Sequence, residues 1–102
     1  MPVRPKKRPP VHPGRPLKMI LDDANLTAHA VALALRIPAN RLTEIISGRR
    51  SISADTAMRL GRYFGTSAQM WMNLQSKYDL DLAEAELSGR IAAEVQPYRQ
   101  TA

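Results

Sequence analysis

Apolar residues recur at helical spacing along most of the chain. The first stripe, Leu17, Ile20 and Leu21 among its members, predicts a helix over about residues 15–25 that has Pro16 in its first turn. A second, shorter helix follows Thr27, which is a good N-cap residue. These two stripes predict a pair of consecutive helices at the start of the folded part.

The next apolar stripe contains Leu42, Ile45 and Ile46 and predicts a third helix. Pro38 ends the second helix and opens the third, because proline suits the first turn of a helix and not its interior. Gly48 supplies the C-terminal stop.

Two further helices begin at serine caps. Ser53 caps a fourth helix, with Asp55 in its first turn, and Gly65 ends it. Ser67 caps a fifth, whose apolar face includes Trp71, interpreted as a core residue. Both predicted helices are therefore amphipathic.

A final apolar stripe runs over residues 80–95 and stops before Pro97. It is too short for a standalone coiled coil and requires a partner surface. No stretch of alternating, β-branched residues bounded by turns appears in the sequence. The pattern thus predicts an all-α fold of five helices with an extra C-terminal helical segment.

The second and third predicted helices are joined by about three residues, from Arg36 to Pro38. So tight a connection is typical of a helix-turn-helix. Ala32 is small where the two helices must cross, and Ile37 can fill the space between them. Residues 26–50 are therefore predicted to form a helix-turn-helix unit.

The outer side of the third helix is short and polar. It comprises Ala39, Asn40, Arg41, Thr43, Glu44 and Ser47. Because asparagine pairs with adenine and arginine with guanine in the major groove, Asn40 and Arg41 are the candidate base-reading residues. Glu44 can accept from a cytosine amino group or merely orient a neighbouring arginine, and a solvated helix face has a similar composition.

Arg49 and Arg50 directly follow the glycine stop and are candidate phosphate clamps. The Thr27 hydroxyl can contact another phosphate or serve only as an N-cap, and His29 is expected at the surface near DNA. The complete set of predicted DNA-binding residues is Thr27, His29, Pro38, Ala39, Asn40, Arg41, Thr43, Glu44, Arg49 and Arg50.

The charge is concentrated at the N-terminus. The 102 residues carry a formal net charge of +6, and residues 1–18 hold six lysines and arginines and no acidic residue. Six of the eight prolines lie in residues 1–16, which predicts an extended arm, read either as a solvated tail or as a non-specific attractor of phosphate. The expected organisation is a basic, proline-rich flexible arm over residues 1–14, a DNA-binding domain over 15–78, and a helical dimerisation segment and tail over 79–102.

Several classes of protein are disfavoured. The chain has no cysteine, and neither His12 nor His29 has a catalytic or metal-binding partner at motif spacing, so no enzyme, metal or cofactor is expected. No apolar run has the roughly 18 residues that a membrane span needs, and a cytoplasmic location is expected. The five aromatic residues mostly lie at core spacing, which argues against an RNA-stacking platform.

Linked motifs in the chain resemble the HigA-type addiction-module antitoxins of the lambda-repressor-like, or Xre, helix-turn-helix class. They are His12-Pro13-Gly14, residues 37–50 (IPANRLTEIISGRR), 53–60 (SADTAMRL), 63–67 (YFGTS), 71–75 (WMNLQ) and 78–80 (YDL). The resemblance covers about residues 12–82. The arm over residues 1–11 and the segment after Leu82 lie outside it.

The resemblance implies a homodimer formed mainly by the C-terminal helices, which binds a palindromic operator and represses its own operon. It also implies direct inhibition of a RelE/HigB-like ribonuclease toxin. The operator-reading positions that it implies are Ala39, Asn40, Arg41, Thr43 and Glu44. The alternatives are a stand-alone Xre regulator without a toxin and a protein-interaction module with a vestigial helix-turn-helix.

One position departs from the family pattern. Related sequences usually place glycine where Arg36 stands, at the end of the second helix. A non-glycine residue in the left-handed conformation costs about 1 kcal/mol or more. Either Arg36 adopts this conformation, or the turn is built differently.

Overall fold

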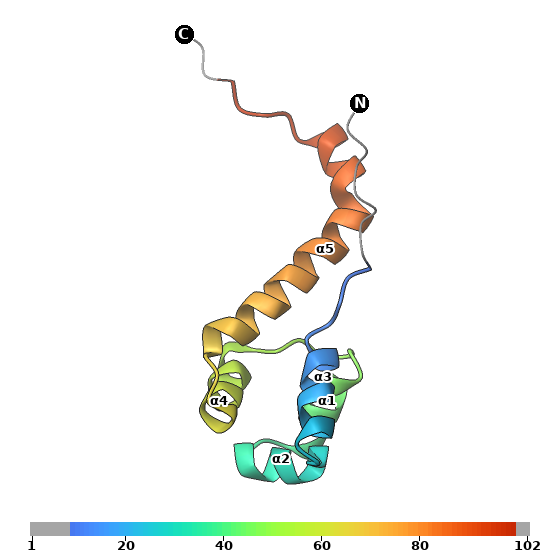
Figure 1. The fold of residues 1–102 in the computed structure, drawn as a ribbon. Coiled ribbons are helices and arrows are strands. Elements are labelled where there is room, and N and C mark those ends of the chain that lie inside the picture. Colours follow the sequence, from blue (N-terminus) through green and yellow to red (C-terminus); the bar gives the residue numbers. More distant parts are fainter. Residues whose placement is uncertain (1–8, 100–102) are drawn as a thin grey trace.

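The computed structural model describes residues 9–99 and is helical, without strands, over that range. The elements are α1 (Gly14–Asp23), α2 (Ala28–Leu35), α3 (Ala39–Ile46), α4 (Ala54–Phe64) and α5 (Ala68–Glu94). Helices α1 to α4 form a bundle, and α5 packs on α4 at its start and then extends away from the bundle (Figure 1). The predicted all-α fold of five helices is confirmed.

Three helices begin where the sequence predicts a capping side chain. The hydroxyl oxygens of Thr27, Ser53 and Ser67 accept hydrogen bonds from the backbone N–H groups three residues on, at 3.1, 3.3 and 3.0 Å respectively. Each bond pairs one of the amides that a helix N-terminus leaves without an intrahelical partner. The starts of α2, α4 and α5 are therefore fixed by local chemistry.

The start of α1 packs closely on α3. Pro13 and Gly14 are buried, although both fall within the predicted arm. A Cβ atom on Gly14 would overlap the backbone carbonyl of Ile45 on α3, so only glycine permits this approach. The packed part of the chain thus begins before residue 15, whereas residues 1–8 of the predicted arm lie outside the described residues.

The core lies between the four bundle helices and the first turns of α5. Its fully buried members include Leu17, Leu42, Ile45, Leu60 and Trp71. Trp71 also donates from Nε1 to the Thr66 hydroxyl at 2.9 Å, so its one polar atom is paired. The core assignment of Trp71 is confirmed.

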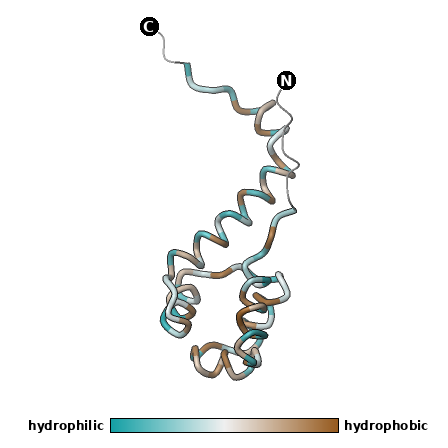
Figure 2. The backbone as a smooth tube through the Cα atoms, in the orientation of Figure 1, coloured by the Kyte–Doolittle hydropathy of each residue, from teal (hydrophilic) through white to brown (hydrophobic). Residues whose placement is uncertain are grey.

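Helix α5 is a single element of 27 residues. The sequence predicted a fifth helix and a separate segment over residues 80–95; the structure joins the two, since neither glycine nor proline interrupts residues 68–88. Hydrophobic positions recur along α5 beyond the bundle (Figure 2). No helix within residues 9–99 is both long enough and apolar enough to cross a membrane.

The turn after α2 resolves the question of Arg36. This residue adopts the left-handed conformation, with φ 61° and ψ 41°. The amide of Ile37 then donates to the Ala32 carbonyl at 3.1 Å, as in turns that end a helix at a left-handed residue. The chain therefore ends α2 with a left-handed turn at a non-glycine residue.

Candidate nucleic-acid interface

The helix-turn-helix is formed by α2, the turn Arg36–Pro38 and α3. Ala32 and Ile37 are buried where the two helices meet, as the sequence predicts. Pro38 immediately precedes α3, and its carbonyl accepts from the amide of Arg41 at 3.1 Å. The short turn and the buried contact hold α3 in a fixed orientation relative to α2.

The outer face of α3 is polar and accessible. Ala39, Asn40 and Thr43 are exposed, whereas Leu42 and Ile45 on the opposite face are fully buried. The Thr43 hydroxyl donates to the Asn40 carbonyl at 3.2 Å. The Asn40 amide has no hydrogen-bond partner among the described residues, so both its donor and its acceptor are available.

Two other polar residues of α3 are held in ion pairs. Arg41 Nη1 lies 3.5 Å from Asp55 Oδ2 on α4, and the Arg41 side chain is 35% exposed. Glu44 Oε2 accepts from Arg50 at 2.8 Å from Nε and 2.7 Å from Nη2. Glu44 thus orients an arginine, one of the two roles its position allows, while Arg41 keeps further N–H donors toward solvent.

The turn after α3 carries Arg49, the second candidate phosphate clamp. Gly48 has φ 81°, and its amide donates to the Ile45 carbonyl at 3.0 Å, so the helix ends as predicted. Arg49 donates from Nε to the Ser47 hydroxyl at 2.9 Å and remains exposed. A row of guanidinium groups therefore borders the C-terminal end of α3.

The remaining predicted residues lie at the start of α2. Thr27 is the N-cap, and His29 is exposed without a partner among the described residues. The free backbone amides of this first turn create a positive end suited to a phosphate.

Sequence reasoning missed the residues that support the interface from behind. Arg59 donates from Nε to both Asp55 oxygens, at 3.2 and 3.1 Å, and from Nη1 to the Leu35 carbonyl at 2.9 Å. One carboxylate thus links Arg41 of α3 to an arginine that caps the end of α2. The i,i+4 spacing of Asp55 and Arg59 was a visible signal, but the contact with Leu35 is not local.

Gln75 is a second missed residue. It is buried, its Oε1 accepts from the backbone amide of Ile52 at 2.7 Å, and its Nε2 donates to Asp79 Oδ1 at 2.9 Å. The first bond attaches the loop after α3 to α5, and the second lies within α5 and fixes the Gln75 amide. A polar residue four positions after Trp71, on the buried face of a predicted helix, was the available signal.

This arrangement defines a helix-turn-helix protein, and the family comparison agrees. The sequence model described as "Helix-turn-helix" matches residues 17–71, which is more than half of the chain. Among residues 9–99, no group of three histidine, aspartate or glutamate side chains is placed to hold a metal ion. The family match thus places the chain in the helix-turn-helix class.

Individual relatives narrow the class. Virulence-associated protein I of Dichelobacter nodosus is 45% identical over 87 residues, covering 84% of this chain and 81% of that protein. The antitoxin HigA of Pseudomonas aeruginosa, solved with the higBA promoter, is 45% identical with a TM-score of 0.85. The match covers 88% of this chain and 99% of that one. A HigA-family antidote protein of Coxiella burnetii is 42% identical with a TM-score of 0.84, and the match covers 89% of this chain and 100% of that one. The chain belongs to the HigA-type antitoxins of the Xre helix-turn-helix family.

Proposed function

We propose that this chain is the antitoxin of a type II toxin-antitoxin module and the dimeric repressor of its own operon. In this role it binds a palindromic operator in the cytoplasm and neutralises a RelE/HigB-like ribonuclease toxin by direct contact. The observation that carries the proposal is the exposed face of α3, where the Asn40 amide is free and Arg49 and Arg50 flank the helix end.

The DNA-binding roles divide by chemistry. A free carboxamide can form paired hydrogen bonds with an adenine edge, so Asn40 is assigned to base reading, and Arg41 to a guanine. Arg49, Arg50 and the first turn of α2 at Thr27 and His29 are assigned to phosphates. Pro38, Ala39, Thr43 and Glu44 complete the predicted contact surface. The P. aeruginosa antitoxin HigA, a relative solved with promoter DNA, supports DNA binding by a chain of this fold.

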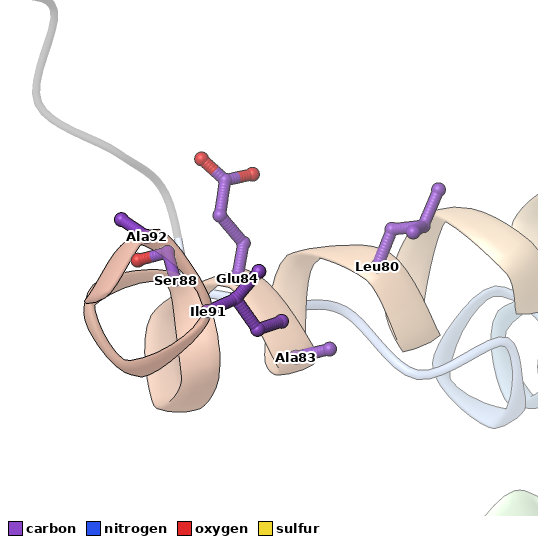
Figure 3. A pocket seen from close by; sticks show the side chains of 6 residues that line it. All are labelled: Leu80, Ala83, Glu84, Ser88, Ile91 and Ala92. Atoms are coloured by element: carbon purple, nitrogen blue, oxygen red, sulfur yellow. The ribbon is translucent and has the colours of Figure 1, made fainter. Parts of the chain in front are cut away.

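Dimer formation is assigned to the outer part of α5. Leu80, Ala83, Ile91 and Ala92 line one shallow apolar hollow on this helix, together with Glu84 and Ser88 (Figure 3). Leu80 is 67% exposed and Ile91 is 50% exposed, so the chain alone leaves this face in water. To bind a palindrome, a twofold dimer formed through this face has to present its two α3 helices about 34 Å apart, in successive major grooves.

The test of repression is a titration of the purified protein on its own upstream DNA and on a scrambled duplex of equal length. A specific repressor prefers its operator by on the order of a thousandfold or more. Equal, weak binding to both duplexes would indicate non-specific electrostatic binding alone and would refute the operator assignment.

The toxin assignment has a separate test. The product of an adjacent gene for a small basic protein should arrest growth when expressed alone, and co-expression of this chain should restore growth through a complex that survives size-exclusion chromatography. The stand-alone regulator without a toxin is the alternative, and it predicts operator binding with neither complex nor rescue.

A further inference from the structure

His12 and Tyr78 belong to two of the motifs that mark the family, and neither residue has a role in the proposed function. The structure brings their rings together. His12 belongs to the first motif, His12-Pro13-Gly14, and Tyr78 opens the second, 66 residues further along the chain. Their ring centroids are 4.9 Å apart with an interplanar angle of 70°, an edge-to-face contact. The segment before α1 is thereby attached to α5.

His12 also lies beside the turn that ends α3, the recognition helix of the helix-turn-helix. Its Nδ1 accepts from the Gly14 amide at 2.9 Å, which fixes the imidazole at the start of α1. A Cβ atom on Gly48, in the turn that ends α3, would lie 3.7 Å from His12 Cγ. His12 therefore lies between α5 and the turn that carries Arg49 and Arg50.

The protonation state of His12 fits this geometry. Burial lowers the pKa of the imidazole, against smaller opposing effects from the Arg50 backbone and the charge of Asp79. The ring is therefore neutral at neutral pH. Nδ1 is then free to accept from the Gly14 amide.

Beyond this contact, α5 leaves the bundle. Its last buried residue is Gln75, which binds Ile52 of the loop after α3, and every residue from Glu84 to Glu94 is exposed. The outer part of α5 extends away from the bundle (Figure 1). The contacts that hold its direction are those of the buried Trp71, of Gln75 and of the His12–Tyr78 ring pair.

We propose that His12 and Tyr78 are positioning residues that set the direction of α5 relative to α3, and through it the half-site spacing that the dimer accepts. The inference rests on the proposed dimeric operator binding. In such a dimer the two recognition helices are connected only through α5. An error in its direction moves each helix out of its groove, because half-sites repeat at about 34 Å.

Loss of the His12–Tyr78 contact should affect the binding of a full operator more than the binding of a single half-site. Each α3 still binds one half-site as before, since its contacts lie outside the junction. The gain from binding the second half-site falls, because this gain depends on the geometry that holds the two modules at the correct separation. Affinity for the full operator and discrimination between spacings should fall together.

The test compares Tyr78→Ala with Tyr78→Phe, which keeps the ring, and with Tyr98→Ala, which removes a tyrosine that is 91% exposed. Binding is measured on the operator, on a single half-site, and on operators with one or two base pairs inserted at the centre. We expect Tyr78→Ala to lose about tenfold on the operator, to keep its half-site affinity and to discriminate less between spacings. Tyr78→Phe and Tyr98→Ala should match the parent protein.

A second measurement is independent of DNA. The chain has no cysteine, so Met58→Cys, at an exposed position of α4, allows one spin label per protomer. The distance distribution between the two labels in the dimer should broaden when Tyr78→Ala is added and stay narrow with Tyr78→Phe.

The outcomes separate the two proposals. An unchanged spacing preference and label distribution in Tyr78→Ala would overturn the positioning role. So would an equal loss on half-site and operator, because it would indicate a stabilising role only. If the parent protein itself does not prefer the operator over a half-site, the proposed dimeric function fails, and the inference fails with it.

Discussion

The α1–α4 bundle and the outer part of α5 are both helical and both carry apolar stripes, but they stand in opposite relations to water. Leu42 in the bundle has no exposed surface, whereas Leu80 on α5 is 67% exposed. Leu60 on α4 is likewise inaccessible, as is Trp71 in the first turn of α5, and Ile91 is half exposed. The bundle and the start of α5 thus form a closed core, whereas the outer part of α5 presents a stripe that only another surface can cover.

The difference separates the tasks of the molecule. The bundle needs a rigid core because the α3 face must arrive at DNA already ordered. The outer helix gains little stability within one chain, since burial of apolar area is the main source of stability. Burial of its apolar stripe stabilises the protein only where another surface covers it, as in the dimer proposed above.

The largest expected effect on stability comes from truncating a leucine to alanine in each of the two regions. Leu42→Ala should lower the unfolding free energy by about 2–5 kcal/mol, since it removes fully buried methyl groups and leaves a cavity. Leu80→Ala should have little effect at low protein concentration and a growing effect as concentration rises, because its burial requires a dimer. Urea denaturation at several protein concentrations gives both numbers, and equal losses independent of concentration would erase the distinction.

The second largest effect is expected at the polar contact that joins α5 to the bundle. Gln75→Leu leaves the buried Ile52 amide without its acceptor, and we expect a loss of about 1–3 kcal/mol in urea denaturation. The matched control is Gln69→Leu, at an exposed position of the same helix where the amide donates only to Asn73. If the two variants are equally stable, Gln75 does not hold α5 to the loop.

A charge placed on the bare stripe should act on assembly and not on folding. Ile91→Asp puts a carboxylate into the proposed dimer face, where its desolvation is unfavourable. The dimer dissociation constant, measured by sedimentation velocity, should therefore rise by about tenfold or more. Ala93→Asp, at an exposed position about 200° around α5 from Ile91, serves as the control. A dimer that tolerates Ile91→Asp as well as Ala93→Asp must use another surface.

The smallest effect concerns two left-handed residues within the bundle. Arg36→Gly should raise the unfolding free energy by up to about 1 kcal/mol, because glycine adopts this conformation without a steric cost. Gly65→Ala should lower it by a similar amount, since its φ is 71° and a Cβ there would meet no atom within 4 Å. Thermal denaturation of the two variants should therefore shift in opposite directions, and a shared direction would contradict the conformational explanation.

Local signals made much of the fold predictable. Thr27, Ser53 and Ser67 act within three residues of themselves, so their capping bonds could be anticipated from sequence. The buried and exposed sides of α3 followed from spacing alone. The continuity of α5 did not, because its inward stripe stops at the edge of the bundle and a second stripe begins.

Contacts between distant segments were beyond the sequence. Arg59 reaches the Leu35 carbonyl across 24 residues, and Gln75 reaches Ile52 across 23. Neither bond leaves a periodic trace. The sequence left open whether Glu44 orients an arginine or accepts from a cytosine, and its contact with Arg50 became visible only in three dimensions.

The most direct test of the α3 interface compares Asn40→Ala and Arg49→Ala on the operator and on a scrambled duplex over a salt series. Asn73→Ala and Arg62→Ala, at exposed positions outside the interface, are the matched controls. The account predicts that Asn40→Ala erodes the preference for the operator, by about 1–3 kcal/mol at the base it reads. Arg49→Ala should weaken both duplexes together and reduce the salt slope by about 1. An Asn40→Ala variant with undiminished preference for the operator would contradict the assignment of α3 as the base-reading helix.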